Sequence, residues 1–159
     1  MRLSARLLHD PVHFFALGGG AGLAPRAPGT AGTLVALPFA WLMLEWPLEW
    51  RFAVVVAVCA AGIALCGASA RRLGVHDHSG IVLDEIAAFL ALSLVLDSRP
   101  GMWLLAFVLF RVFDIAKPWP IRDVDHRLHG GLGIMLDDLM AAAYAAACLL
   151  AIDVLLAAT

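Results

Sequence analysis

The stretch of sequence that decides the fold covers residues 52–70 and reads FAVVVAVCAAGIALCGASA. Its 19 residues carry no charged side chain, whereas Arg51 precedes the stretch and Arg71 and Arg72 follow it. An α-helix needs about 20 predominantly apolar residues to cross the hydrocarbon core of a bilayer. We therefore predict that this stretch is a transmembrane helix.

The composition of the whole chain agrees with lipid contact. Of the 159 residues, 62% are hydrophobic and 15% are charged, compared with roughly 45–50% and 25% in soluble globular proteins. The length predicts a single domain over residues 1–159. The net charge of −2 argues against nucleic-acid binding, which needs Lys and Arg in clustered excess. Nothing in the sequence indicates an oligomeric state.

Four further apolar segments accompany the first. They cover residues 34–44, 81–96, 102–116 and 139–158. The segment 34–44 is short and contains Pro38, so we expect it to be interfacial or only partly inserted. The last segment is rich in Ala, and small residues let membrane helices pack closely.

The N-terminal part of the chain predicts a short helix followed by a loop. Asp10 is a favourable N-cap and Pro11 a favourable first helical residue, so a helix is expected over residues 11–17 until the glycines at 18–20 end it. A loop is expected over residues 18–32, ending in a turn over residues 28–33. The predicted fold class is all-α: a membrane-embedded helical bundle with about four to five apolar helices and a short N-terminal interfacial helix.

The basic residues predict the orientation of such a bundle. If all five apolar segments cross the membrane, Arg51 and Arg99 lie on one side. The side that holds the N-terminus receives the other eight basic residues, namely Arg2, Arg6, Arg26, Arg71, Arg72, Lys117, Arg122 and Arg127. Cytoplasmic loops carry an excess of Lys and Arg. We therefore expect a multi-pass protein with a cytoplasmic N-terminus.

Acidic residues mark the ends of three apolar segments on the same predicted side. Asp84 and Glu85 begin the segment 81–96, Asp114 closes the segment 102–116, and Asp137 and Asp138 precede the segment 139–158. Carboxylates near a membrane interior are costly unless they are paired or functional. A divalent cation would remove their mutual repulsion, and an all-oxygen ligand set favours Mg²⁺, Mn²⁺ or Ca²⁺. All five acids are therefore candidate metal ligands.

Basic, hydroxyl and imidazole groups near these acids suit a phosphoryl group. Arg111, Lys117 and Arg122 supply positive charge of the kind that holds phosphate oxygens. The turn at residues 29–33 carries two further candidate phosphate-binding residues, Thr30 and Thr33, whose hydroxyl groups could join a backbone nest. His129 precedes two glycines and could donate to phosphate or protonate a leaving oxygen.

Simpler interpretations stand beside these. Any one acid could merely cap a helix, although that is less convincing for two adjacent pairs plus Asp114. Cys66 and Arg72 fit the Cys-x5-Arg spacing of thiol phosphatases, but Cys66 lies in an apolar run that does not favour a thiolate. His76 and His78 could bind metal, but a solvated loop is the plainer interpretation.

Four stretches together resemble the signature segments of the phosphatidylglycerophosphatase A family. They read PGTAGTL at residues 28–34, VHDHSGIVLDE at 75–85, FRVFDIAKPWPI at 110–121 and HGGLGIMLDD at 129–138. The resemblance implies an all-helical enzyme of the bacterial inner membrane. It also implies hydrolysis of phosphatidylglycerophosphate, a phospholipid, to phosphatidylglycerol and phosphate with Mg²⁺ as cofactor.

The expected chemistry is metal-assisted hydrolysis of a phosphomonoester at the cytoplasmic membrane face. Its main metal-ligand candidates are Asp84, Glu85, Asp137 and Asp138. Asp114 would be a further ligand or a base, while Arg111 and Lys117 would neutralise phosphate oxygens. Water could attack directly, or an aspartate could first take the phosphoryl group. The rival hypotheses are a cation transporter, a non-catalytic structural membrane protein, and a phosphatase for another lipid phosphate.

Overall fold

The computed structural model describes residues 3–75 and 78–158, and those residues form helices without any β-strand. The α-helices are α1 (Pro11–Ala16), α2 (Pro28–Leu42), α3 (Leu48–Leu73), α4 (Leu83–Leu92), α5 (Pro100–Ala116), α6 (Ile121–Arg127) and α7 (Gly130–Ala157). The 3-10 helices are η1 (Ala5–His9), η2 (Gly18–Leu23), η3 (Met43–Glu45) and η4 (Ser93–Val95). The all-α fold class is therefore confirmed.

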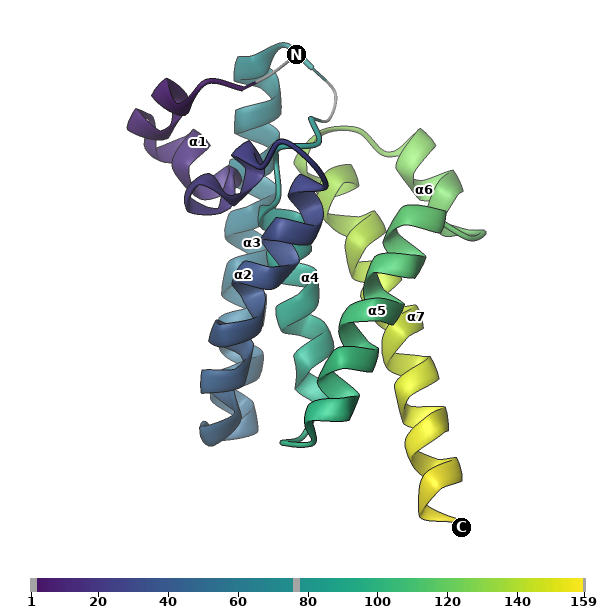
Figure 1. Cartoon of the computed structure of the whole chain (residues 1–159). Helices are drawn as coiled ribbons and strands as arrows, with labels where there is room; N and C mark the ends of the chain where they lie inside the picture. The colour runs from purple at the N-terminus through teal and green to yellow at the C-terminus, as the bar shows by residue number, and fades with distance from the viewer. Residues whose placement is uncertain (1–2, 76–77, 159) are drawn as a thin grey trace.

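Helices α2, α3, α4, α5 and α7 form a bundle in which α4 is central. α4 packs against α2, α3 and α7, while α5 packs mainly against α7. Figure 1 shows α1 and α6 at one end of the bundle, which we call the α6 end. At the opposite end, called the far end, α7 runs past the other helices to the C-terminus (Figure 1).

Aromatic packing fixes α5 against α4. Phe89 of α4 is fully buried, and its ring lies 6.0 Å from that of Phe110 and 6.4 Å from that of Trp103, both on α5. Aromatic rings at such distances pack favourably beyond their buried area. The packing holds the last turn of α5, which carries charged residues, beside the first turn of α4.

Helices α3 and α7 approach each other so closely that glycine is required between them. A Cβ atom added to Gly131 of α7 would lie 1.7 Å from the Ile63 carbonyl oxygen of α3. A Cβ atom on Gly67 of α3 would lie 2.9 Å from the Gly131 backbone nitrogen. The close approach sets the position of α7 against the remainder of the bundle.

Glycine explains two errors in the sequence-based boundaries. We expected a turn over residues 28–33, but α2 begins at Pro28, a favoured first helical residue, and Gly29 and Gly32 lie inside the helix. We expected the last apolar helix to begin at residue 139, but α7 begins at Gly130. Glycine at 131 serves packing rather than a turn. Asp137 and Asp138 therefore lie within α7 instead of preceding it.

The N-terminal helix follows the prediction closely. Asp10 caps α1, and its side chain accepts a hydrogen bond from the Val12 backbone nitrogen at 2.9 Å. α1 docks on the last turns of α3, where Arg72 forms an ion pair with Asp10 and the Ser69 hydroxyl lies 2.9 Å from His13 Nδ1. Helix α6 was not predicted, because its seven residues carry no apolar run.

Two of the described helices are long and apolar enough to cross a membrane, namely α3 with 26 residues and α7 with 28. At about 1.5 Å per residue, such helices exceed the roughly 30 Å of a hydrocarbon core. The segment expected over residues 81–96 is shorter, because its α-helix α4 has 10 residues before it tightens into η4. The structure thus supports two membrane-spanning candidates and leaves the predicted count of four to five unconfirmed.

Candidate active site

Three carboxylates from two helices meet inside the bundle towards its α6 end. Asp84 and Glu85 occupy the first turn of α4, and Asp138 lies in the third turn of α7, which packs along α4. One oxygen atom from each of the three lies within 4.8 Å of the others. Asp84 is 6% exposed and Asp138 is 4% exposed. We call these three residues the carboxylate cluster.

Two basic residues from α5 and its C-terminus flank the carboxylate cluster. Arg111 lies 2.7 Å from Asp114, one turn along α5, and 3.8 Å from Glu85. Lys117, which ends α5 in a left-handed conformation, places Nζ 2.5 Å from Asp137 and 2.8 Å from Asp125. Both cations therefore already contact acids.

The pKa of Lys117 follows from this placement. Burial by itself lowers the pKa of an ammonium group, but hydrogen bonds from Nζ to Asp125 and Asp137 outweigh that effect. The pKa of Lys117 is therefore held above its usual value. Lys117 carries a fixed positive charge throughout the physiological pH range.

The charges at the site do not balance. Counting Asp125, six carboxylates gather there, and the two flanking cations leave four negative charges if all the acids are ionised; the acids are Asp84, Glu85, Asp114, Asp125, Asp137 and Asp138. The Glu85 Oε2 atom is buried and has no hydrogen-bond partner among the described residues. A buried carboxylate oxygen without a donor is costly. An oxygen-lined, electron-rich site of this kind fits a hard divalent cation such as Mg²⁺ or Mn²⁺.

The first turn of α2 closes the site from a third side. A Cβ atom on Gly29 would lie 2.1 Å from Glu85 Oε1 and 3.0 Å from a terminal nitrogen of Arg111. Only glycine allows this close approach of backbone to carboxylate. Thr30 follows Gly29 and is partly exposed beside Arg111. The hydroxyl of Thr33 is buried and donates to the Gly29 carbonyl oxygen at 3.0 Å, inside α2.

Two predicted site residues lie apart from the carboxylate cluster. His129 is exposed, immediately precedes α7 and places Nδ1 3.1 Å from the Arg127 carbonyl oxygen. Asp138 of the carboxylate cluster follows it nine positions later, which corresponds to about 14 Å along the axis of α7. Arg122 is exposed on α6. Both belong to the α6 end but contact none of the three clustered acids in the described hydrogen bonds and ion pairs.

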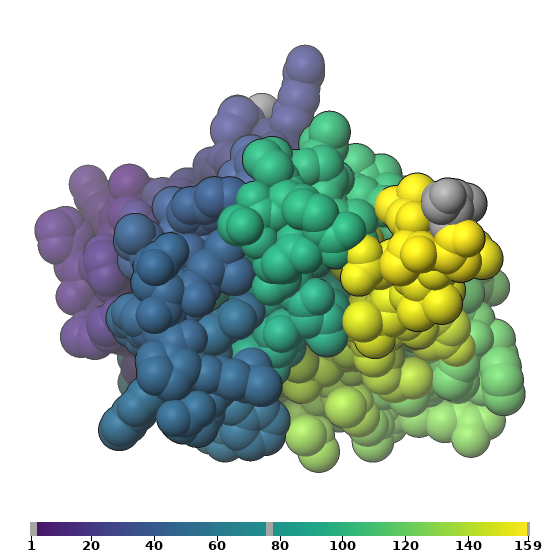
Figure 2. Space-filling model, turned by 90° about the horizontal axis from the view of Figure 1, so that it is seen from below, coloured from purple at the N-terminus to yellow at the C-terminus, as the bar shows by residue number. Residues whose placement is uncertain are grey.

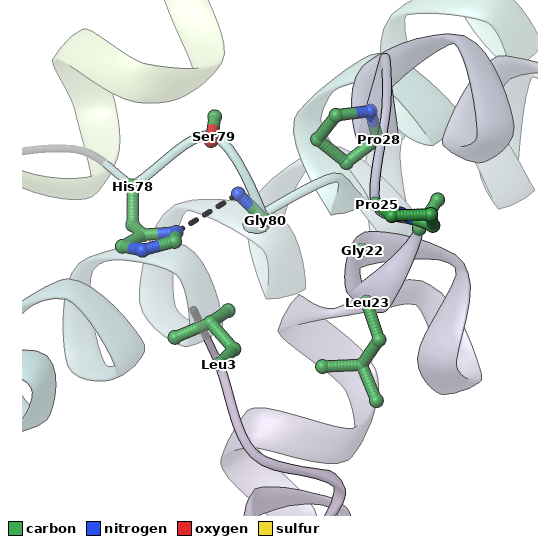
Figure 3. A pocket seen from close by; sticks show the side chains of 9 residues that line it. Leu3, Gly22, Leu23, Pro25, Pro28, His78, Ser79 and Gly80 are labelled. Atoms are coloured by element: carbon green, nitrogen blue, oxygen red, sulfur yellow. Dashed lines mark hydrogen bonds between the residues drawn. The ribbon is translucent and has the colours of Figure 1, made fainter. Parts of the chain in front are cut away.

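A separate polar pocket adjoins the start of α2. It has a volume of about 280 Å³ and is lined in part by Leu3, Gly22, Pro28, His78 and Gly80. Figure 3 shows the His78 ring at its edge, where Nδ1 accepts a hydrogen bond of 3.0 Å from the Gly80 backbone nitrogen. His76 and Asp77 lie outside the described residues. Of the two histidines considered as metal ligands, the structure therefore describes only His78.

The structure also settles one alternative and adds one residue. Cys66 is fully buried and Arg72 is paired with Asp10, so they do not form a phosphate cradle. Asp125 was missed by the sequence analysis, although it is the second partner of Lys117. Its only sequence signal was its place in the polar stretch between two signature segments.

Comparison with known proteins places the chain among relatives. A family model described as Phosphatidylglycerophosphatase A matches residues 14–153. A curated Escherichia coli protein named Phosphatidylglycerophosphatase A is 44% identical over 137 residues, covering 84% of this chain and 78% of that protein. A Haemophilus influenzae protein of the same name is 41% identical over 148 residues, covering 92% and 91%.

A more distant relative carries a different name. A Bacteroides thetaiotaomicron protein, named provisionally as a phosphatidylinositol-3-phosphatase, is 37% identical over 136 residues, covering 80% of this chain and 84% of that protein. No significant match is found among solved structures. The family model spans most of the chain, and two curated relatives of that name align with most of their own length. This chain belongs to the phosphatidylglycerophosphatase A family.

Proposed function

We propose that this chain is a Mg²⁺-dependent lipid phosphatase that hydrolyses phosphatidylglycerophosphate to phosphatidylglycerol and inorganic phosphate. The observation that carries the proposal is the buried carboxylate cluster, with one oxygen from each acid within 4.8 Å of the others, in a chain of this family. The names of the two most similar relatives above supply the substrate. A bound metal ion would offset the excess negative charge and would give the unpartnered Glu85 oxygen a partner.

The residues divide into two roles in this proposal. Asp84, Glu85 and Asp138 would hold Mg²⁺, which when bound supplies a Lewis acid for the phosphoryl oxygens. Arg111 and Lys117 would neutralise further phosphate oxygens, and their present carboxylate partners, Asp114 and Asp137, keep them oriented. Asp114 would serve as a further ligand or as a base for the attacking oxygen.

The surface residues of the α6 end would act earlier. Arg122 and His129 are exposed at this end and lie outside the carboxylate cluster. Their place suits attraction of the anionic head group before it reaches the buried acids, because long-range attraction needs no direct contact. His129 would then be placed to donate to the phosphate or to protonate its leaving oxygen as the head group arrives.

The exposed apolar surface supports a membrane location. Only 28% of the most apolar stretch of α3 and 22% of that of α7 are buried inside the protein, whereas a soluble core helix would be mostly buried. The far end, seen in Figure 2, is formed by the joined ends of α2 and α3 (blue), the start of α5 (green) and the last turns of α7 (yellow). Trp46 and Trp50 are exposed near that joint, as is typical of a membrane interface.

These features lead to a proposed orientation in the bacterial inner membrane. Basic residues gather at the α6 end, including Arg71 and Arg72 at the end of α3 and Lys117 after α5. Positive charge favours the cytoplasmic side. The α6 end, with the N-terminus and the carboxylate cluster, would then face the cytoplasm in a multi-pass protein.

The proposal is tested by phosphate release from purified protein in detergent. The substrates are phosphatidylglycerophosphate, phosphatidic acid and phosphatidylinositol 3-phosphate, each with Mg²⁺ and with excess EDTA. We expect release from the first lipid with Mg²⁺, none with EDTA, and restoration when Mg²⁺ is added back. Faster phosphate release from either of the other lipids would show that the proposed substrate is wrong. Phosphate release that is unaffected by EDTA would show that the reaction does not depend on a metal ion.

A matched pair of variants locates the reaction. Asp84→Asn alters the carboxylate cluster, whereas Asp153→Asn alters an exposed acid at the far end of α7. We expect the first variant to lose Mg²⁺-dependent phosphate release and the second to retain it. Equal activity of the two variants would place the reaction elsewhere in the molecule.

A further inference from the structure

A shallow groove runs along the exposed face of α5, beside Thr30 in the first turn of α2. Its volume is about 450 Å³, and its apolar lining comes from Phe107, Val108, Val112, Ile115 and Ala116 of α5. Two polar side chains complete the lining, Thr30 of α2 and Arg111 of α5.

The polar end of this groove coincides with the edge of the active site. Arg111 lines the groove and also lies 2.7 Å from Asp114 and 3.8 Å from Glu85. Thr30 follows Gly29, where an added Cβ atom would lie 2.1 Å from Glu85 Oε1 and 3.0 Å from a terminal nitrogen of Arg111. A ligand in the groove would therefore have one end beside a guanidinium group and the other against hydrocarbon side chains.

The dimensions of the groove suit one leaflet of a bilayer. From Phe107 to Ala116 the helix rises nine residues, which is about 14 Å at 1.5 Å per residue. Half of the roughly 30 Å hydrocarbon core is about 15 Å. Val108, Val112 and Ile115 recur at helical spacing and are exposed, so the groove is open to the side where lipid would lie.

We propose that this groove holds an acyl chain of the lipid phosphate substrate and guides its head group to Arg111 and the carboxylate cluster. The inference rests on the proposed function. An anionic head group complements Arg111 and an acyl chain complements the apolar lining, so one amphiphile satisfies both. A second hollow of about 360 Å³ is lined by α2, α3 and α4, with residues such as Phe39, Val54 and Leu90; its lining is only apolar and contains no cation to hold a head group.

The test compares a long-chain substrate with its head group alone. Val108→Trp and Val112→Trp narrow the groove without changing a charged residue. Val56→Trp is the control, because Val56 lies on α3, lines neither hollow and is 50% exposed, compared with 46% for Val108. Kinetics are measured for dioleoyl phosphatidylglycerophosphate in mixed micelles and for the deacylated glycerophosphoglycerophosphate in solution.

The proposal predicts a split between the two substrates. Both groove variants should raise KM for the lipid about tenfold, the loss expected when about two methylene groups lose apolar contact. They should change kcat/KM for the deacylated substrate by less than about twofold, and Val56→Trp should change neither. Equal losses on both substrates would mean that the groove residues merely support the active site. An unchanged KM for the lipid would also overturn the proposal.

A binding experiment separates this inference from the proposed function. Unsubstituted protein and the Trp variants are irradiated with phosphatidylglycerophosphate that carries a diazirine in one acyl chain, and labelled peptides are identified by mass spectrometry. The proposal predicts that α5 is labelled and that excess unlabelled lipid suppresses the labelling. Val108→Trp should abolish this labelling and Val56→Trp should not. This result would support acyl-chain binding in the groove even if no phosphate is released. Labelling of α5 that excess lipid does not suppress would contradict it.

Discussion

Acidic and basic side chains meet at both ends of this molecule, and the two groups differ in burial and in balance. At the far end, Arg99 lies 2.7 Å from Asp97 and 2.6 Å from Asp153, and all three side chains are about half exposed. At the α6 end, buried acids outnumber the nearby cations, and a Glu85 oxygen has no hydrogen-bond partner among the described residues.

The difference shows which features distinguish a candidate site from surface charge. Water screens the exposed group at the far end, so its ion pairs contribute little to stability or chemistry. The buried group is poorly screened by water, and a divalent cation bound there would offset its excess negative charge. The buried charge at the far end is a single cation, Arg51, which donates to the Ser93 carbonyl oxygen. The convergence of several buried acids, rather than the number of charges, distinguishes the α6 end.

The largest expected contrast concerns activity and stability together. Asp138→Asn should lower phosphate release about 10²–10³-fold, the loss typical of one electrostatic contact to a reacting group. In EDTA the same variant should unfold at a higher temperature than unsubstituted protein, because one uncompensated buried charge is gone.

Asp153→Asn provides the matched comparison on the same helix. Its activity should be retained and its melting temperature should fall slightly or not at all, because it loses one exposed ion pair. Circular dichroism melts and phosphate release in detergent measure both quantities. A lower melting temperature for Asp138→Asn in EDTA would show that the acids stabilise the fold and would weaken the assignment of a metal site.

The second contrast concerns the cations. Lys117→Met should lower the free energy of unfolding by about 2 kcal/mol, less than the 3–5 kcal/mol of a fully buried pair, because Lys117 is about a quarter exposed. Arg99→Met should lower the free energy of unfolding much less than Lys117→Met, because the ion pairs of Arg99 are exposed and screened by water. Chemical denaturation in EDTA measures the free energy of unfolding of both variants. Equal losses of stability would show that the charged groups at the two ends do not differ in this respect.

The third contrast concerns two glycines. Gly131→Ala forces a Cβ atom to within 1.7 Å of the Ile63 carbonyl oxygen and should cost about 1–3 kcal/mol by overpacking. Gly101→Ala at the far end meets no atom within 4 Å and should be neutral or stabilise α5 by up to about 0.5 kcal/mol. Thermal melts test both, and a neutral Gly131→Ala would show that α3 and α7 adjust easily.

The sequence predicted the helices that consist of a long apolar run. The uncharged stretch 52–70 lies within α3, and the segment 102–116 lies within α5. Boundaries failed where glycine had more than one possible role, as at Gly29 and Gly131. Local sequence does not reveal whether a glycine forms a turn or permits close packing, because the packing partner is distant in the chain.

The candidate site was predictable in outline for a related reason. Acids next to apolar segments were expected to converge, and the structure brings Asp84, Glu85 and Asp138 together. The pairing of Lys117 with Asp125 was not predictable, because it depends on how the short helix α6 folds back. The proximity of Gly29 to Glu85 likewise required the packing of α2 on α4.

The smallest contrast separates two threonines that the sequence treated alike. Thr33→Val removes the buried hydrogen bond to the Gly29 carbonyl oxygen and should cost about 1 kcal/mol of stability with little change in KM. Thr30→Val changes a partly exposed hydroxyl beside Arg111 and should instead raise KM for the lipid about two- to threefold, with stability unchanged within about 0.5 kcal/mol. Steady-state kinetics measure KM for the lipid, and denaturation measures the free energy of unfolding, for both variants. If Thr33→Val raised KM as much as Thr30→Val, the first turn of α2 would act as one phosphate-binding unit. The division between a structural and a ligand-facing threonine would then be wrong.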